Sequence, residues 1–198
     1  MKPQSDSVRD QILASGRTLV AARGFSGMGL AELLKTARIP KGSFYHYFAS
    51  KEDFGCKLLE QYLDQYVTRL DELLGGDRPD ARAALMQYWS LWIGTQTSGD
   101  ARTQCLIVKV GAEVSDISDE MRRILQVGTD TITGRIVQAI ADGLDDGSIA
   151  RTVDPDALGP ALYQMWLGAS LMAKLSRKPD PLLQAMTATE LMLPRAPL

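Results

Sequence analysis

The chain has 198 residues, of which 45% are hydrophobic, and it carries a formal net charge of -2 with a pI near 5.5. This hydrophobic content is ample for a folded core, and two cysteines are too few for a disulfide framework, so a disordered chain and a disulfide-stapled domain are both excluded. The longest nearly apolar run, residues 161–173, is shorter than a bilayer span requires, which excludes a transmembrane role.

The charge is distributed unevenly along the chain. Residues 1–60 contain nine Lys and Arg against six Asp and Glu, a net +3, which leaves 13 against 18, a net -5, for the remainder. A basic end suits a nucleic-acid partner, although the acidic average does not. Because no N-terminal apolar stretch is typical of a signal peptide, we expect a cytoplasmic protein.

Apolar residues recur at three- and four-residue spacing along nearly the whole chain, which predicts an all-α fold. In the N-terminal part, this pattern predicts a helix that ends before Gly24, a second over 30–37 and a third over 41–48, with Pro40 between the last two. Ser50, followed three residues later by Asp53, is expected to cap a long fourth helix that runs to residue 74.

After the Gly- and Pro-containing segment 75–79, the spacing predicts five more helices. They are expected at about 80–97, 105–114, 119–143, 154–175 and 181–193. The helix that contains residues 161–173 is apolar nearly all round, so it must be covered on both sides. This helix, which contains Trp166, and the last helix, which contains Met186, are therefore predicted to form a two-helix dimerisation face, in which a charge at Ala169 would not be tolerated.

The second and third predicted helices have the spacing of a helix-turn-helix, in which the second helix enters the major groove of DNA. Apolar residues on one side of the third helix can anchor it to the second. The other side carries charge, hydroxyls and aromatic edges, where a buried helix would show Leu and Ala. The residues on this polar side are Lys41, Ser43, Tyr45, His46 and Tyr47.

The same segment resembles the N-terminal signature of the TetR family of repressors. The resemblance covers about residues 8–55 and rests on Gly24-Phe25, on LAELL at 30–34 and above all on KGSFYHYFASKE at 41–52. It implies an all-α fold of nine or so helices, a homodimer bound to palindromic operator DNA, and a cavity for a small-molecule inducer in the C-terminal half. It also implies a helix-turn-helix domain at 1–50 and a regulatory and dimerisation domain at 51–198.

Position by position, the polar side of the third helix matches the family's recognition helix, and Lys51 matches its phosphate-binding lysine. Three positions depart from the family pattern. Met28 and Gly29 stand where two threonines usually open the second helix, so a backbone N–H at Gly29 is expected to contact phosphate instead. Arg38 replaces a common turn glycine, and Pro40 replaces a capping serine, which a helix start tolerates.

An aromatic packing cluster is the alternative interpretation of Tyr45, His46 and Tyr47, because aromatic side chains bury large areas. Within the signature we favour the DNA-binding interpretation. His46 is the only histidine, and a single histidine provides neither a metal cluster nor a partnered catalytic base. Gly-rich phosphate loops and serine nucleophile elbows are missing from the sequence as well. We therefore expect no enzymatic activity, no metal and no cofactor.

Large aromatic residues with polar atoms mark two helices of the C-terminal half, an arrangement suited to an amphipathic ligand pocket. The expected pocket residues are Tyr88, Trp89 and Trp92 from one helix and Tyr163 and Trp166 from the other. A packed aromatic core is an equally good interpretation of the same residues.

Cys105 is a candidate sensor. Thr103 is expected to cap the following helix, which would place the thiol in the first turn, where the helix dipole and Lys109 favour a thiolate. The segment 105–113, with residues 166–169 and 173–176, resembles the subgroup that includes the N-ethylmaleimide reductase repressor, whose regulators respond to electrophiles or oxidants through a cysteine. Lys174 could approach the thiolate. Cys105 could instead be a small packing residue, which is our interpretation of Cys56.

These patterns predict a DNA-binding transcriptional repressor that a small molecule, a reactive electrophile or oxidant, releases from its operator. The alternative is a helical carrier or enzyme that does not bind DNA, as the acidic net charge and the aromatic C-terminal half would allow. The basic and aromatic surface of residues 41–51 argues against that alternative, because a carrier has no need of it.

Overall fold

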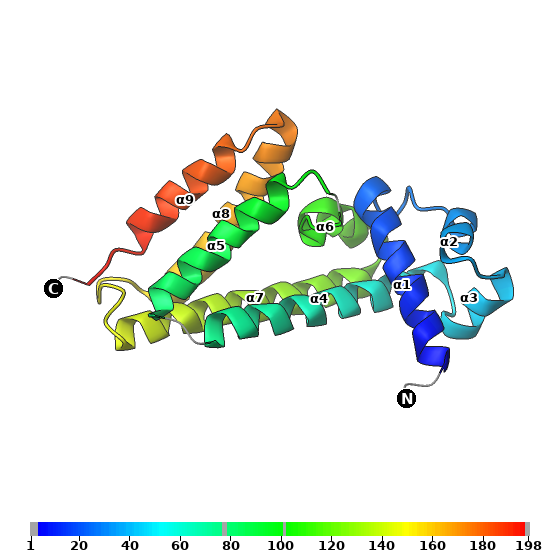
Figure 1. The fold of residues 1–198 in the computed structure, drawn as a ribbon, viewed down its shortest axis with the longest axis horizontal. Helices are drawn as coiled ribbons and strands as arrows, with labels where there is room; N and C mark the ends of the chain where they lie inside the picture. Colours follow the sequence, from blue (N-terminus) through cyan, green and yellow to red (C-terminus); the bar gives the residue numbers. More distant parts are fainter. Residues whose placement is uncertain (1–3, 77–78, 101, 197–198) are drawn as a thin grey trace. The chain divides into compact units, whose positions relative to one another are not determined.

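The computed structural model describes residues 4–76, 79–100 and 102–196, and every regular element within them is an α-helix. In chain order (Figure 1) the helices are α1 (Gln4–Arg23), α2 (Leu30–Ala37), α3 (Lys41–Tyr47), α4 (Lys51–Gly75), α5 (Ala81–Thr97), α6 (Leu106–Ile117), α7 (Asp119–Asp145), α8 (Pro155–Ser176) and α9 (Asp180–Met192). The predicted all-α fold is confirmed. No described helix is long and apolar enough to cross a membrane.

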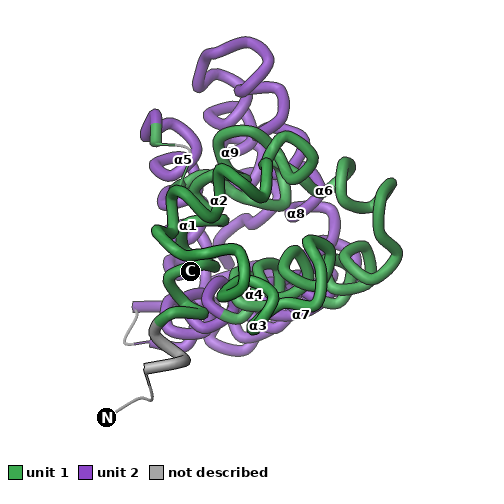
Figure 2. Tube along the Cα trace, turned by 90° about the vertical axis from the view of Figure 1, so that its right-hand side faces the viewer, with its two compact units in different colours: residues 1–64, 100–127 green, residues 65–99, 128–198 purple. Residues whose placement is uncertain are grey.

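The chain forms two compact units, which Figure 2 colours separately. The first comprises Met1–Asp64 and Asp100–Val127, and the second comprises Gln65–Gly99 and Gly128–Leu198. The helix-turn-helix and α6 therefore belong to the same unit, although some 60 residues separate them in sequence. The boundary that we predicted after residue 50 follows the sequence signature and stays a prediction.

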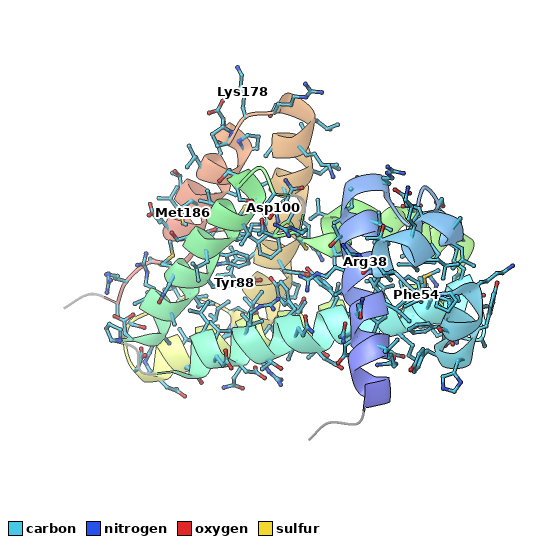
Figure 3. All side chains as sticks on the ribbon, turned by 45° about the vertical axis from the view of Figure 1, so that its right-hand side comes forward. Arg38, Phe54, Tyr88, Asp100, Lys178 and Met186 are labelled. Atoms are coloured by element: carbon cyan, nitrogen blue, oxygen red, sulfur yellow. The ribbon has the colours of Figure 1, made fainter. Side chains whose placement is uncertain are left out.

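A phenylalanine cluster forms the core beneath the helix-turn-helix. Phe44 of α3, Phe48 after it and Phe54 of α4 have ring centroids 5.2–5.7 Å apart, and all three are at most 1% exposed. The Phe54 ring (Figure 3) also lies against α1, where a Cβ at Gly16 would come within 2.2 Å of it. This close contact requires glycine, so one aromatic cluster holds α1, α3 and α4 together.

Local signals fix the helix ends of this first unit. The Ser50 hydroxyl accepts the Asp53 N–H at 3.0 Å, while the Asp53 carboxylate accepts the Ala49 N–H at 2.9 Å, so the predicted cap of α4 is confirmed. Gly24 ends α1 with a φ of 81°. Arg38 ends α2 in the left-handed conformation, which explains why a glycine is easier to place there.

The second unit is built around α8 and α9, which pack against each other. Asp154 caps α8 by accepting the N–H groups of Asp156 and Ala157, and Asp80 caps α5 by accepting that of Ala83. Arg82 of α5 donates to the Leu193 carbonyl at 2.6 Å, which ties the end of α9 to this helix. Within the predicted break at 75–79, Asp77 and Arg78 lie outside the described residues.

One predicted boundary was displaced. The helix expected at 105–114 begins at Leu106 and continues to Ile117. Cys105 is the residue that precedes its first turn, with an extended backbone, and Ser118 ends it. Thr103, which we expected to cap this helix, instead donates its hydroxyl to the Asp100 carbonyl at 2.8 Å. Thr103 therefore belongs to the preceding turn, and the thiol lies outside the first turn.

Candidate DNA-binding surface and thiol site

The turn between α2 and α3 is closed by backbone hydrogen bonds and one side chain. The N–H of Arg38 bonds to the Lys35 carbonyl at 3.3 Å, and that of Ile39 bonds to the Leu34 carbonyl at 3.1 Å. From α1, the Gln11 amide donates to the Ala37 carbonyl at 3.0 Å. These bonds satisfy the carbonyl groups at the end of α2 and fix the direction in which α3 leaves the turn.

The two sides of α3 differ in exposure as the sequence predicted. Phe44 is fully buried, whereas Lys41 and His46 are exposed and Tyr45 is 50% exposed. Ser43 and Tyr47 are half-buried, with their positions on the helix between the two sides. The buried centre of the packing cluster beneath this helix consists of phenylalanines. Both tyrosines also contact it, Tyr45 edge to face with Phe44 at 5.3 Å and Tyr47 with Phe48 at 6.4 Å, so the aromatic-packing interpretation holds for one side of each tyrosine ring while Tyr45 and His46 stay exposed.

Side chains on the polar side of α3 also contact one another. The Lys41 ammonium lies 5.9 Å from the centroid of the Tyr45 ring, and the His46 and Tyr47 rings meet edge to face at 4.8 Å. Beyond α3, the Lys51 ammonium lies 5.0 Å from the centroid of the Phe25 ring. Gly29, the residue before α2, is exposed and has open space around it. The N–H groups at an exposed helix start can bind phosphate.

Cys105 is buried at the start of α6 and contacts Tyr62 of α4. The Tyr62 hydroxyl donates to Cys105 Sγ at 3.7 Å and accepts the N–H of Leu106 at 3.1 Å. Burial raises the pKa of the Cys105 thiol, and this outweighs the opposing hydrogen bonds from the backbone of Val108 and Ile107 and from Tyr62. The local pattern favours a thiolate at this position, whereas loss of solvation on burial favours the neutral thiol.

The other residues of the predicted sensor are placed differently. Lys109 donates its ammonium to the Ala22 carbonyl at the end of α1, at 3.3 Å. Lys174 belongs to the second unit, so its approach to Cys105 stays a prediction. Cys56 is buried in α4, and its pKa is raised by burial and by the neighbouring carboxylates of Glu120 and Glu52.

The five predicted pocket residues form a buried aromatic cluster in the second unit: Tyr88 (labelled in Figure 3), Trp89, Trp92, Tyr163 and Trp166. The Trp89 and Trp166 rings stack 4.8 Å apart and nearly parallel. Trp92 donates to the Ser170 hydroxyl at 2.8 Å and Trp166 to that of Thr189 at 3.0 Å. The rings pack on one another in this conformation, which fits the core interpretation, and their role as a pocket stays a prediction.

Two residues of the first unit were missed by the sequence reasoning. Tyr62 contacts the thiol, and Glu113 of α6 bonds to the turn after α1. In the sequence Tyr62 is one of many apolar positions on a long helix, and Glu113 is one of many helical acids. Their partners lie 43 to 88 residues away, so no local pattern identifies them.

Two protein families match the chain. Residues 12–54 match the bacterial regulatory proteins of the tetR family, and residues 81–189 match the tetracyclin repressor-like C-terminal domain. The first match contains the helix-turn-helix described above, and the second contains Cys105 and the aromatic cluster. Among the described residues, no group of three or more His, Cys, Asp or Glu is placed to hold a metal ion.

Individual relatives extend the match to nearly the whole chain. The chain is 40% identical over 185 residues to the transcriptional repressor NemR of Escherichia coli, which covers 93% of both chains. It is 36% identical to the transcriptional regulator AcuR of Cereibacter sphaeroides, over 91% of this chain and 82% of AcuR. The crystal structure of the reduced form of E. coli NemR superposes with a TM-score of 0.92, at 38% identity, over 97% of this chain and 100% of the other.

Proposed function

The chain belongs to the TetR family of bacterial regulatory proteins, and we propose that it is a transcriptional repressor that leaves its operator when a small molecule acts on it. One observation carries the proposal. On α3 the phenylalanine is buried while Lys41, Tyr45 and His46 are exposed. A solvent-facing set of this kind on the second helix of a helix-turn-helix is what major-groove recognition requires. The named relatives are regulators, which disfavours a carrier or an enzyme.

In the proposed complex α3 lies in the major groove, and the side chains on its exposed side contact base edges and phosphates. Tyr45, His46 and Tyr47 offer ring edges and hydrogen-bonding groups, and Ser43 offers a hydroxyl. Lys41 and Lys51 supply positive charge on either side of this surface. Phosphate contacts fix the position of the helix, whereas contacts to base edges determine the sequence that it binds. The backbone N–H of Gly29 adds a phosphate contact from the start of α2.

The proposed active form is a homodimer on a palindromic operator, because two recognition helices must reach half-sites roughly 34 Å apart. Large apolar side chains on α8 and α9 support this form, since a monomer rarely exposes so many on two adjacent helices. Leu175 is 69% exposed and Leu191 is 77% exposed. The further members of this set are Leu171, Met172, Leu183 and Met192.

For release, we propose that Cys105 reacts with an electrophile or oxidant. With a quinone or maleimide, the thiol loses its proton to water and the sulfur adds to the activated C=C bond. A C–S bond forms, the C=C π bond breaks, and the adjacent carbon takes up a proton from water. The bulky adduct cannot be accommodated at a side chain that is only 6% exposed, so α6 has to move. Reversing the population from about 99% binding-competent to 1% requires about 5.5 kcal/mol, which a covalent change can supply.

Two measurements test the proposed function. A labelled fragment of the DNA that flanks the gene should bind the protein with an affinity that falls steeply with salt, because lysine contacts to phosphate release counterions. N-ethylmaleimide or a quinone should release this fragment from the wild type and from Cys56→Ser, but not from Cys105→Ser. If Cys105→Ser is released at the same dose, the inducer is a reversible ligand instead, and the aromatic cluster is where it would bind.

A further inference from the structure

Glu113 of α6 binds the turn that follows α1. One carboxylate oxygen accepts the N–H of Phe25 at 3.1 Å, and the other accepts the N–H of Ser26 at 2.5 Å. Both oxygens are therefore occupied by consecutive backbone N–H groups of the DNA-binding domain, 87 and 88 residues away in sequence. Hydrogen bonds from neutral donors to a charged acceptor are about twice as strong as neutral ones.

Lys109, one turn earlier on the same face of α6, binds the other side of the junction. Its ammonium donates to the carbonyl of Ala22 at 3.3 Å, in the last turn of α1. The charges match the backbone groups that they contact: a cation at the carbonyl groups that end a helix, and an anion at the N–H groups that follow. Together, Lys109 and Glu113 hold the end of α1 between them, and we call this pair of contacts the α6 clasp.

The turn is shaped to receive the carboxylate. Gly24 has a φ of 81°, which L side chains rarely adopt, and a Cβ there would lie 2.7 Å from Glu113 Oε2. On the other side of the turn, Phe25 is buried against α4, where a Cβ at Gly55 would meet its ring at 2.7 Å. The turn is therefore held on two sides: the Phe25 side chain packs into the core, and the Phe25 backbone N–H bonds to Glu113 of α6.

This turn leads directly into α2, the first helix of the helix-turn-helix, which begins four residues after Ser26. The orientation of α2 and α3 thus depends on how the turn is held. We propose that Glu113 is a positioning residue for DNA binding: by fixing the 24–26 turn from α6, it makes the position of α6 a determinant of operator affinity. The proposal rests on the proposed DNA-binding function, and it does not require Cys105 to be the sensor.

The test compares Glu113→Gln with Asp116→Asn. Glutamine keeps one acceptor oxygen but presents an NH2 donor to the second N–H, so the clasp loses at least one bond. Asp116 is exposed on the same helix, and its substitution removes the same charge without touching the turn. Because each change removes a negative charge, electrostatics alone would tighten DNA binding in both. Glu113→Asp keeps the charge but shortens the side chain, so it separates reach from charge.

We expect Glu113→Gln and Glu113→Asp to bind a fragment of the flanking DNA about tenfold more weakly than the wild type, with helix content unchanged. Hydrogen exchange of the Phe25 and Ser26 amides should accelerate in both variants, while Asp116→Asn keeps wild-type protection and binds at least as tightly as the wild type. The wild-type exchange alone already tests the clasp, because unprotected Phe25 and Ser26 amides would overturn it even if both Glu113 variants failed to fold.

Equal or tighter binding by a folded Glu113→Gln variant would also overturn the inference, while leaving the proposed function intact. Failure of the wild type and of Asp116→Asn to bind the DNA fragment would instead refute the proposed function. In that case the two amides would still show whether α6 holds the turn. The two failures are therefore distinguishable by the behaviour of the wild type.

Discussion

Tyr62→Phe removes one hydroxyl from the interior of the first unit and tests the contact between α4 and the start of α6. The hydroxyl accepts the Leu106 N–H at 3.1 Å and donates to Cys105 Sγ at 3.7 Å, and Tyr62 is 4% exposed. The Arg17 guanidinium lies 5.1 Å from the centroid of the same ring. The phenylalanine ring preserves the packing and the cation–π contact, so the substitution isolates the hydrogen bonds.

The expected cost follows from the group that loses its acceptor. Leu106 is 3% exposed, and a buried N–H left without a partner costs about 1–3 kcal/mol, more than the net value of an ordinary hydrogen bond. For a chain of this length each kcal/mol lowers the Tm by about 2–4 °C. The thiol should respond as well. A hydrogen bond to sulfur favours the thiolate, so its removal raises the pKa of Cys105 further and slows alkylation at neutral pH.

The assay is urea unfolding at matched protein concentration, since dimerisation would otherwise shift the apparent stability. Tyr45→Phe is the control, because its side chain is 50% exposed and its loss of a hydroxyl should change stability by less than about 0.5 kcal/mol. Alkylation of Cys105 is followed by mass spectrometry over a range of pH. If Tyr62→Phe is as stable as Tyr45→Phe, or if its thiol reacts at the wild-type rate, Tyr62 does not support the start of α6 and the reasoning fails.

Lys41→Ala and Tyr47→Phe should each weaken operator binding by about 1–3 kcal/mol with little change in Tm, and unfolding of either variant would place that side chain in the core. Leu175→Glu should convert the proposed dimer to monomers in sedimentation experiments, and an intact dimer would show that this part of α8 is not in the interface. Ala169→Glu is a poorer probe, because Ala169 is buried within its own chain and a charge there would disturb the fold as well. Burial raises the pKa of Glu113, but the hydrogen bonds from Ser26 and Phe25 outweigh burial and lower this pKa below its usual 4.5. The ionised carboxylate therefore stabilises the fold above that pH, and this stabilisation should be lost as the pH falls through the lowered pKa. Urea unfolding over this pH range should show a smaller loss of stability in Glu113→Gln than in the wild type.

The helix-turn-helix could be predicted from the sequence because its determinants are local. Gly24, Pro40 and the Ser50–Asp53 cap each act within four residues, and the structure places helix ends at all three. The division of α3 into a buried and an exposed side follows from helical periodicity, with Phe44 as the buried residue. Such features need no knowledge of the rest of the chain.

The environment of Cys105 could not be predicted in the same way. A helix start favours a thiolate only when the thiol is solvated, and solvation depends on residues distant in sequence. Tyr62, which covers the thiol and bonds to it, is separated from Cys105 by 43 residues. Local signals at a helix start therefore omit the largest influence on the Cys105 thiol, because burial raises its pKa by more than the neighbouring hydrogen bonds lower it.

The grouping of α6 with the DNA-binding helices has the largest consequence for regulation. Sequence order places residues 100–127 in the C-terminal half, where we had assigned them to regulation, yet they form a compact unit with residues 1–64. Within this unit, α6 begins beside the thiol that we propose as the sensor and, two turns later, binds the turn that precedes α2 through Glu113. A single short helix thus connects Cys105 to the 24–26 turn. Hydrogen bonds hold α6 at its start through Tyr62 and, within the next two turns, through Lys109 and Glu113. A displacement of its first turn that reaches these residues would shift the 24–26 turn or break the α6 clasp, and either event would alter the support of the recognition helix.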